Sequence, residues 1–444
     1  MRDLVMGREP KDYDVATDAT PAEVVRLFPG SLTVGARFGV VAVPGDGAPI
    51  EIATFRSDGV YVDGRHPAEV RYAKTPEEDV RRRDFTINGL LYDPVEERVI
   101  DYVGGQADIR ARRLRTIGEP EARFAEDRLR MFRAVRFAAR LDFTLDASTF
   151  EAIREFAPAI HEVSAERIRD EILKILTEGG ARRGFEMLGK TSLLQEVLPE
   201  VKAFQGVAQP PEFHPEGDVW IHTLMMLERM QSPSATLALG VLLHDVGKPP
   251  TFVVRERIRF DGHAEIGAKM AGAICRRLKL SSRDTERVVA LVAEHMRFKD
   301  FSKMRRSTQL KFLALDGFEE HLELHRLDCL SSHGNLDIYE AARTLMRETP
   351  AEVVKPKPLV TGDDLIALGY PPGPHFKEIL DAVRDAQLEE QIKTREEGLA
   401  LVRRGFPETK AMASGVGIEQ RSGALASPAD DSADRSDEGR NPSS

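Results

Sequence analysis

The spacing of apolar and polar positions predicts a mixed α and β region over the first hundred residues. Short apolar runs at 39–43 and 50–55 flank the turn-forming segment PGDGAP, and this pattern predicts a β-hairpin. Upstream of it, Thr20 and Pro21 suit the N-cap and the first position of a helix over residues 20–28.

From about residue 120 the pattern becomes helical, with apolar residues three and four positions apart. This spacing predicts helices over 125–140, 147–157 and 164–178. A stretch rich in Pro, Gly and Gln predicts a linker, and a polar C-terminal stretch is typical of a disordered tail. We therefore expect six parts: a head (1–118), a helical neck (119–204), a linker (205–217), a second helical domain (218–347), a short helical element (348–407) and a tail (408–444).

Composition narrows the class of protein. The chain has 444 residues, 41% of them hydrophobic and 31% charged, which is typical of a globular protein with a sizeable core. Its two cysteines exclude a disulfide scaffold and fit a reducing, cytoplasmic setting. The charged start MRDLVMGREPKDYD is unlike a signal peptide, and no apolar window is long enough to predict a membrane span.

Charge is distributed unevenly along the chain. The net charge is −10, which predicts no general attraction to nucleic acid. Residues 110–140 nevertheless contain ten arginines and only four acids. A solvated helix face would explain them, but arginine also forms paired hydrogen bonds with phosphate. The segment therefore predicts a local phosphate-binding surface.

The segment KDYD is the first candidate for catalysis. On a strand, Asp12 and Asp14 would point to the same face, and Glu51 at the start of the run IEIATF could add a third carboxylate. Paired carboxylates suit Mg²⁺, and two such ions can serve nucleotidyl transfer. A D-x-D pattern alone is most often a surface turn, so its context decides the interpretation.

That context consists of RRDFTIN at 82–88, DYVGG at 101–105 and EDRLR at 126–130. Together with D-x-D, these motifs resemble the class II tRNA nucleotidyltransferase (CCA-adding) and bacterial poly(A) polymerase family over roughly residues 1–200. The resemblance implies that the carboxylates of Asp12, Asp14 and Glu51 hold Mg²⁺. It also implies that Arg82, Arg83, Asp84 and Asn88 contact the sugar and phosphates of the incoming nucleotide.

The same resemblance implies a protein template for the base. Asp127 and Arg130 would pair with the edge of C or A, and Glu126 would orient them. A surface ion pair is the alternative. Arg133 and Arg136 are candidates for triphosphate or RNA contact, although a salt-bridged helix face would explain them as well.

The beginning of the chain departs from the family pattern. Met1-Arg2-Asp3 stands where the family has G-G-x-V-R-D, so the two glycines are absent and Arg2 and Asp3 remain as nucleotide-binding candidates. We therefore expect an N-terminally truncated head that lacks its first strand and helix. A start assigned too far downstream would explain this, and lost activity is the alternative.

Histidines and aspartates in the second helical block predict a metal site. They stand in the order H…HD…H…H…D, which resembles the HD-domain phosphohydrolases, and the segment HDVGK fits the usual H-D-x-G-K. The resemblance implies that His222, His244, Asp245 and Asp328 are the four core metal ligands. It also implies that His263 and His295 match the additional histidines of family members that bind two metal ions. Mn, Ni, Fe, Co or Mg would suit such ligands, whereas a degenerate HD fold without metal is the alternative.

Together the motifs predict an α+β fold, in which a small mixed-sheet nucleotidyltransferase head precedes an all-helical neck and a helical HD domain. The implied activity is transfer of CMP and AMP from CTP and ATP to the tRNA 3′ end, with a second phosphohydrolase activity in the HD domain. Alternatives are an A-adding enzyme, a poly(A) polymerase, or an HD phosphohydrolase with an inactive RNA-binding head. The oligomeric state stays open.

Overall fold

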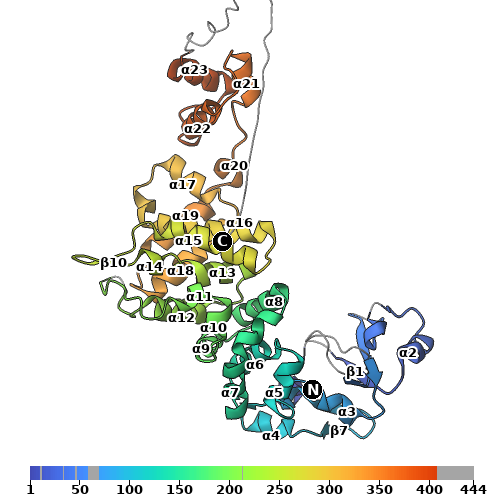
Figure 1. Ribbon diagram of the computed structural model, residues 1–444. Helices are drawn as coiled ribbons and strands as arrows, with labels where there is room; N and C mark the ends of the chain where they lie inside the picture. The colour runs from blue at the N-terminus through green and yellow to red at the C-terminus, as the bar shows by residue number, and fades with distance from the viewer. Residues whose placement is uncertain (11–12, 34, 46–47, 59–69, 213, 408–444) are drawn as a thin grey trace, which may run out of the picture. The chain divides into compact units, whose positions relative to one another are not determined.

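The structure is a computed structural model that describes residues 1–10, 13–33, 35–45, 48–58, 70–212 and 214–407 (Figure 1). The described residues form two compact units, one up to Pro356 and one that begins at Lys357. The tail predicted over 408–444 lies outside the described residues.

A three-stranded sheet forms the first part of the head, with the strand order β1-β3-β2. β3 pairs antiparallel with β2, which confirms the predicted hairpin, and parallel with β1. Helix α2 is capped by Thr20 and Glu23 in a reciprocal capping box, and its Val24 packs on Val41 and Val43. The elements are α1 (Arg2–Val5), β1 (Val15–Thr17), α2 (Pro21–Leu27), η1 (Ala36–Phe38), β2 (Val40–Val43) and β3 (Ile50–Thr54).

Two further hairpins and short helices complete the head. The buried side chains of Phe85 and Ile87 anchor the RRDFTIN segment in the main hydrophobic core. The carboxylate of Asp101 accepts the backbone N–H groups of Gly104, Gly105 and Gln106, which shapes the DYVGG turn before α4. The elements are β4 (Arg56–Asp58), β5 (Val70–Tyr72), α3 (Pro76–Arg81), η2 (Thr86–Asn88), β6 (Leu90–Asp93), β7 (Arg98–Asp101), α4 (Gly105–Arg110) and β8 (Arg113–Leu114).

The neck is helical, but the helix predicted over 125–140 is broken. α5 ends at Glu126 and α6 begins at Arg130, because Asp127 is extended and its carboxylate caps the backbone N–H of Leu129. The two other predicted helices form with nearly the expected bounds. The elements are α5 (Pro120–Glu126), α6 (Arg130–Leu141), β9 (Thr144–Leu145), α7 (Ala147–Phe156), η3 (Ala157–Glu162), α8 (Ala165–Thr177), α9 (Ala181–Lys190), α10 (Leu193–Val197) and α11 (Pro199–Lys202).

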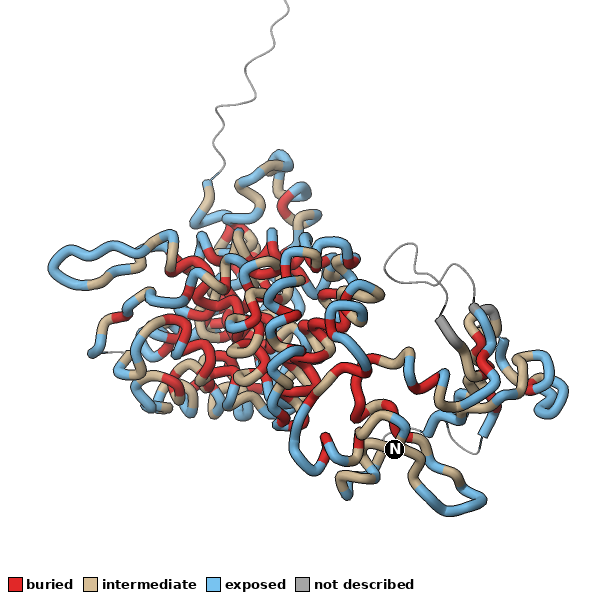
Figure 2. The backbone as a smooth tube through the Cα atoms, turned by 60° about the horizontal axis from the view of Figure 1, so that its bottom comes forward, coloured by how far each residue is buried: buried red, intermediate tan, exposed pale blue. Residues whose placement is uncertain are grey.

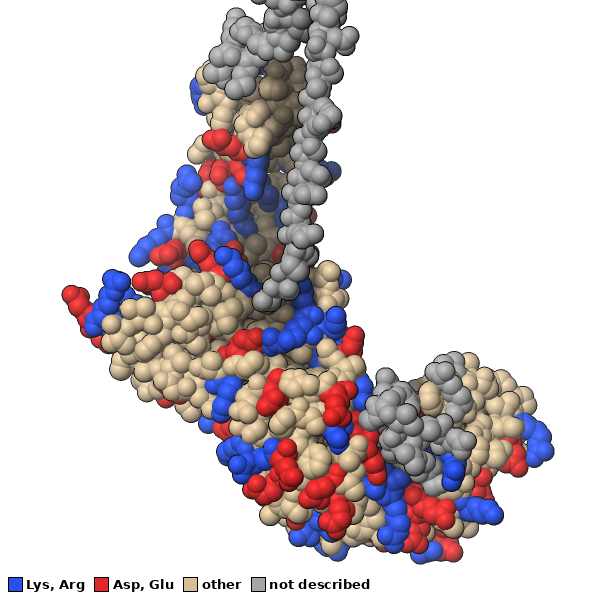
Figure 3. All heavy atoms as spheres, in the orientation of Figure 1, with Lys and Arg blue, Asp and Glu red and all other residues tan. Residues whose placement is uncertain are grey.

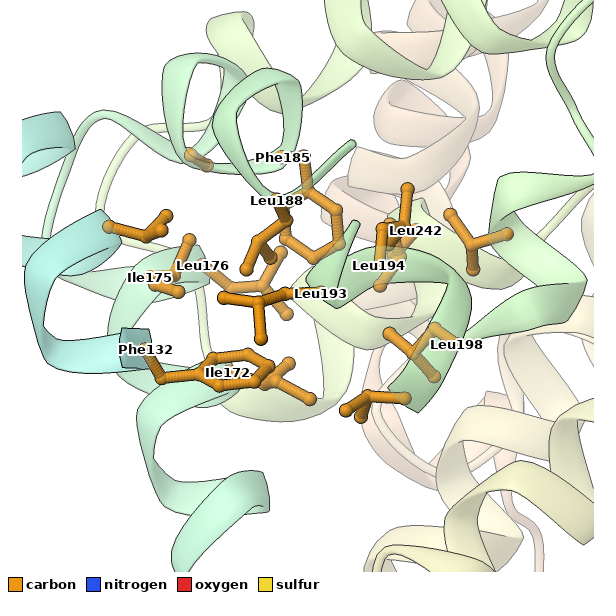
Figure 4. Close-up of a cluster of buried hydrophobic side chains, with 14 of the residues drawn as sticks. Phe132, Ile172, Ile175, Leu176, Phe185, Leu188, Leu193, Leu194, Leu198 and Leu242 are labelled. Atoms are coloured by element: carbon orange, nitrogen blue, oxygen red, sulfur yellow. The ribbon is translucent and has the colours of Figure 1, made fainter. Parts of the chain in front are cut away.

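The next helical block shares a hydrophobic core with the neck. Figure 4 shows Leu242 of α13 beside Leu194 of α10, in a cluster that also holds Phe132, Ile172 and Phe185. In Figure 2, buried residues are concentrated in the stacked helices. The elements are α12 (Val219–Arg229), α13 (Ala235–Leu243), α14 (Lys248–Thr251), β10 (Val253–Val254), β11 (Ile258–Arg259), α15 (His263–Arg277), α16 (Ser282–Glu294), η4 (His295–Lys303), α17 (Arg306–Leu313), α18 (Phe318–Ser331), α19 (Asp337–Glu348) and α20 (Ala351–Val354).

The second unit is a small helical bundle with its own core around Leu365, Ile379 and Val402. Its helices are α21 (Gly362–Ala367), α22 (His375–Leu388) and α23 (Arg395–Gly405). Thr361 and Thr394 each open a helix with a capping box.

Charged side chains of both signs are interspersed over the face of the molecule in Figure 3. The basic segment 110–140 is largely neutralised by acids, because its arginines pair with carboxylates such as Asp108, Glu126, Glu171 and Glu178. Among the described residues, no helix is long and apolar enough to cross a membrane.

Candidate functional site

Two of the three predicted catalytic carboxylates come together at the edge of the head sheet. β1 and β3 are parallel with Val15 opposite Ile52, so the preceding residues, Asp14 and Glu51, stand at neighbouring positions and share a face of the sheet. Both residues are exposed. Asp12 lies outside the described residues. The sheet therefore presents two adjacent acids of the kind that bind Mg²⁺.

Both arginines of the RRD motif are held by one carboxylate. Asp79 of α3 is buried; its Oδ1 lies 2.7 Å from Arg82 Nη2 and its Oδ2 lies 2.8 Å from Arg83 Nη2. Burial raises the pKa of Asp79, but the two guanidinium groups outweigh this and lower it below its ordinary value. Asp79 was not predicted from the sequence, although its place three and four residues before the two arginines was a usable signal.

Asp84, Asn88 and Arg2 form a connected hydrogen-bond network with Arg133. Arg133 of α6 donates to Asp84 from Nε at 2.8 Å and from Nη2 at 2.6 Å. Asn88 donates to Asp84 at 3.0 Å and accepts from Arg2 at 2.9 Å. Arg2 also pairs with Asp3 at 3.0 Å. Four predicted nucleotide-binding residues, with Asp3 beside them, thus organise one another.

The pKa of Asp84 reflects its place in this network. Burial raises the pKa, but Arg133 and the hydrogen bonds from Asn88 and the Phe85 N–H lower it below the ordinary value. Asp84 is therefore ionised inside the protein, where it fixes Arg133 rather than standing open to solvent.

The two predicted base-selecting residues have separate supports. Arg130 pairs with Glu126, as expected, and donates to the backbone oxygen of Arg82 at 3.2 Å. Asp127 is instead held by Arg167 of α8, whose Nη2 lies 2.7 Å from Asp127 Oδ2. Arg130 is thus tied to the RRD segment, and Asp127 is tied to the neck.

Arg136 lies in a buried ion pair. Its Nε donates to Glu171 Oε2 at 2.6 Å, and the side chains are 7% and 3% exposed. Its Nη1 lies 3.5 Å from Glu178. The guanidinium of Arg136 is thus committed to carboxylates of α8 and its C-terminus, whereas Arg133 is one-third exposed.

The histidines and aspartates of the HD pattern converge from five helical elements. Asp245 lies at the centre: its Oδ2 is 3.1 Å from His244 Nε2, and its Oδ1 is 3.8 Å from Nε2 of both His263 and His295. His222 Nε2 lies 3.2 Å from Asp328 Oδ1. Three-residue groups from this cluster have ligand atoms close enough to share a metal ion. The structure therefore brings together all six residues named from the sequence.

Backbone carbonyls orient three of the imidazoles. The Nδ1 atoms of His244, His263 and His295 lie 2.9, 2.9 and 2.7 Å from carbonyl oxygens of residues three positions earlier. An Nδ1–H that donates to a carbonyl leaves Nε2 as a lone pair, the form that binds metal. Each Nε2 atom faces the Asp245 carboxylate, so the tautomers suit a metal at the centre.

Glu216, a carboxylate that was not predicted from the sequence, orients the fourth imidazole. Glu216 is largely buried and its Oε1 lies 2.7 Å from His222 Nδ1 and 2.9 Å from His214 Nδ1. Burial opposes protonation of His222, but the carboxylates of Asp328 and Glu216 raise its pKa to about 9. Burial and the neighbouring histidines act the other way on His295 and lower its pKa to about 4.

Buried atoms that lack a well-formed hydrogen bond test whether the site fits a metal. Among the described residues, His222 Nε2, His244 Nε2 and Asp245 Oδ2 are buried and have no well-formed hydrogen bond. Buried polar atoms are normally satisfied, and imidazole nitrogen with carboxylate oxygen is a common donor set for divalent transition metals. The residues present therefore fit a divalent metal.

Lys248 and a cavity complete this centre. The Nζ of Lys248 lies 2.7 Å from Asp245 Oδ2 and donates to Gln209 at 2.6 Å. A cavity of about 780 Å³ opens onto the cluster, and His244, Asp245, His263, His295 and Asp328 line it. A ligand can thus reach the side chains that converge on Asp245.

Three family models match successive parts of the chain. Residues 1–115 match the poly A polymerase head domain, residues 142–205 match the "Probable RNA and SrmB- binding site of polymerase A", and residues 218–327 match the HD domain. These matches confirm the predicted family resemblance and the α+β fold class.

Known proteins match the chain in two ways. The CCA-adding enzyme of Geobacillus thermodenitrificans is 44% identical to it over 193 residues, which are 44% of this chain and 48% of that protein. The CCA-adding enzyme of Lactobacillus johnsonii is 37% identical over 232 residues, which are 51% of this chain and 58% of that protein. The chain thus spans about half the length of the curated relatives that it matches. The chain also superposes on the crystal structure of the Bacillus stearothermophilus CCA-adding enzyme in complex with CTP. The superposition covers 91% of each chain, with 28% sequence identity and a TM-score of 0.68.

Proposed function

We propose that this chain, whose head, RNA-binding and HD regions match those of the poly(A) polymerase and CCA-adding enzyme family, adds CMP and AMP from CTP and ATP to the 3′ end of tRNA. The observation that carries the proposal is the parallel pairing of β1 with β3, which sets Asp14 beside Glu51. The CCA-adding relatives, one of them in complex with CTP, support this substrate choice over an A-adding enzyme or a poly(A) polymerase.

In this reaction the terminal 3′ oxygen of the tRNA forms a bond to the α-phosphorus of the nucleotide. The bond to the bridging oxygen breaks, pyrophosphate leaves, and the hydroxyl loses its proton. Asp12, Asp14 and Glu51 would hold Mg²⁺, which when bound neutralises charge on the reacting phosphates. Arg82, Arg83 and Arg133 add positive charge for the triphosphate, so positioning and electrostatics supply most of the rate.

Asp127 and Arg130 would choose the base. A carboxylate accepts hydrogen bonds and a guanidinium donates them, so the pair can complement the edges of C and A without a nucleic-acid template. Their supports, Arg167 and Glu126, keep both groups in a fixed orientation.

Incubating the full chain with tRNA that lacks its 3′ CCA, and with labelled CTP and ATP, tests the proposal. We expect C, C and A at the terminus, and at least about a 100-fold lower rate for Asp14→Ala, since a metal-holding carboxylate is lost. Asp18→Ala is the matched control, because Asp18 is an exposed acid just after β1. Addition of A alone, long A tracts, or full activity of Asp14→Ala would contradict the proposal.

A second function is favoured by the buried nitrogen and oxygen atoms of the HD cluster that form no well-formed hydrogen bond. We propose that this centre hydrolyses phosphate esters: water forms a bond to phosphorus, the bond to the ester oxygen breaks, and the leaving oxygen takes a proton. His222, His244, Asp245 and Asp328 would hold the metal with His263 and His295. When bound, such a metal acts as a Lewis acid that activates water near neutral pH.

This second function is tested by metal content and by hydrolysis together. The purified chain, loaded in turn with Mn, Ni, Fe, Co or Mg, is expected to release phosphate from a 3′-phosphorylated RNA or to open a 2′,3′-cyclic nucleotide. His244→Ala should lower bound metal and hydrolysis, whereas His161→Ala, an exposed histidine outside the cluster, should change neither. Equal metal content and hydrolysis in His244→Ala would contradict the ligand assignment.

A further inference from the structure

Arg123 of α5 connects the end of a head helix to the base-selecting segment. Its Nη2 lies 2.7 Å from Oε1 of Glu126, three residues later in the same helix. Its Nη1 donates to the backbone oxygen of Arg81, the last residue of α3, at 3.3 Å. One guanidinium group therefore joins two segments that are forty-two residues apart in the sequence.

Glu126 divides its carboxylate between two arginines. Its Oε1 pairs with Arg123, and its Oε2 pairs with Arg130, which is predicted to select the base. A carboxylate that is held at both oxygens has a fixed plane, whereas one that is held at a single oxygen can turn about its last bond. The direction in which Glu126 holds Arg130 thus depends on Arg123.

Arg130 is buried and is held by acceptors that lie around Arg123. Besides its pair with Glu126, it donates from Nη1 to the backbone oxygen of Arg123 and from Nη2 to that of Arg82, both at 3.2 Å. Arg123 binds the carbonyl of the preceding residue, so the two guanidinium groups occupy successive carbonyls at the C-terminal end of α3. Carbonyl groups at a helix end lack partners within the helix. The end of α3 is therefore a common anchor for both side chains.

The same helix end leads into the arginines that are predicted to bind phosphate. Arg82 and Arg83 follow α3 directly, and the carboxylate of Asp79 in α3 holds them both. Asp79 does not contact the selector, so the phosphate side of the site has a support of its own. Arg123 instead helps to fix the distance between the base-selecting residues and this phosphate side.

The pair of Arg123 with Glu126 differs from an ordinary ion pair on a helix surface. Such pairs, three residues apart, are usually exposed and contribute little. Arg154 and Glu151 on α7 form one of this kind, with side chains that are 52% and 65% exposed. In the pair of Arg123 with Glu126 the side chains are only 19% and 22% exposed, and each of them contacts a further residue.

We propose that Arg123 is a positioning residue for the choice of nucleotide. It holds Glu126 against the end of α3, so that Arg130 meets the edge of C or A at a fixed distance from the triphosphate. The inference rests on the nucleotidyl transfer proposed above and deepens it. Because Arg123 acts through the base-selecting residues, its loss affects recognition of the base more than recognition of the triphosphate, which all four nucleotides share.

Single-nucleotide addition by the full chain tests this role. The acceptors are tRNA without CCA and tRNA that ends in CC, and kcat/KM is measured with each of the four nucleoside triphosphates. We expect Arg123→Ala to lower kcat/KM for CTP and ATP about 10-fold and for UTP and GTP less than about twofold, as for one misplaced hydrogen-bond partner. Arg154→Ala, which breaks the exposed pair on α7, is the matched control and should change none of the four values.

A double-mutant cycle distinguishes positioning from a general structural role. If Arg123 acts through Glu126, Arg123→Ala should lower the value for CTP by less than about twofold once Glu126→Gln is present. The same 10-fold loss in both backgrounds would overturn the proposal. Arg123→Lys keeps the charge without the planar fork, so its value should lie between those of wild type and Arg123→Ala, and it replaces Arg123→Ala if that variant does not fold.

The outcomes separate this inference from the function on which it rests. If the wild-type chain adds C, C and A but Arg123→Ala lowers the values for all four nucleotides equally, the positioning role is overturned while nucleotidyl transfer stands. If the wild-type chain adds no nucleotide, the proposed transfer fails, and calorimetric binding of CTP and UTP to the full chain decides on Arg123. A preference for CTP that disappears in Arg123→Ala would support the role. An unchanged preference, or no preference in the wild type, would overturn it.

Discussion

Arg133 of α6 donates two hydrogen bonds, of 2.8 and 2.6 Å, to Asp84, which lies forty-nine residues earlier in the sequence. Both side chains were predicted to contact the nucleotide, yet each has the other as its main partner. This pair joins the RRDFTIN segment to the neck, so the position of the arginines that are predicted to bind phosphate depends on a helix outside the head.

Arg133→Ala is expected to destabilise the protein. Removing one partner of a buried ion pair costs about 3–5 kcal/mol, and Arg133 is one-third exposed, so we expect roughly 2 kcal/mol or slightly more. The apparent Tm followed by circular dichroism should fall by at least about 4 °C. Arg154→Ala breaks a pair in which both partners are more than half exposed and should lower the Tm by less than about 2 °C. An equal shift in both variants would show that the Asp84 pair has no special weight.

Arg167→Ala is expected to weaken the choice of nucleotide. Without its hydrogen bond of 2.7 Å, Asp127 loses a fixed orientation toward the base. We expect kcat/KM for CTP and ATP to fall about 10-fold and incorporation of UTP and GTP to fall less, since a misplaced hydrogen-bond partner costs on the order of 1–3 kcal/mol. Steady-state assays with each nucleotide measure this ratio. Arg169→Ala, on the same helix but paired with Asp170, should leave the ratio unchanged.

Acid is expected to destabilise the head through Asp108. Burial raises the pKa of Asp108, but hydrogen bonds from Thr86, Arg113 and Arg115 outweigh this and lower it below 3.8. A carboxyl whose pKa is depressed by folding adds stability above its unfolded pKa, and this stability is lost as the pH falls through the folded value. The Tm gap between wild type and Asp108→Asn should therefore narrow from pH 7 to pH 3. A gap that stays constant would contradict the assignment.

Gly247→Ala is expected to disturb the HD cluster without removing a ligand side chain. A Cβ at this position would lie 2.0 Å from the backbone oxygen of His263, so α15 would have to move. We expect less bound metal, measured by elemental analysis, and a lower Tm. Gly272→Ala in α15 meets only side chains at 3.3 Å and should keep both values close to wild type. Normal metal content in Gly247→Ala would show that this close approach does not position His263.

The sequence predicted local features well and long-range pairs poorly. Thr20 as N-cap, the hairpin of β2 with β3 and the six HD residues depend on near neighbours or on a recognisable motif. Glu171 and Arg167 could not be assigned to Arg136 and Asp127, because those contacts exist only once α8 packs on α6. The break at Asp127 was missed for a different reason: the apolar spacing continues through it, although the cap on the Leu129 N–H that causes the break is local.

The cluster of Figure 4 has a consequence for dividing the chain. α13 ends just before the His244-Asp245 pair and packs against α8 of the neck, within a core that also contains residues of α10. Cutting the chain near residue 210 would expose this hydrophobic surface on both fragments, and we expect each fragment to aggregate when it is expressed alone. The head, the neck and the HD cluster therefore depend on one continuous core, so local unfolding of the neck should also destabilise the HD cluster.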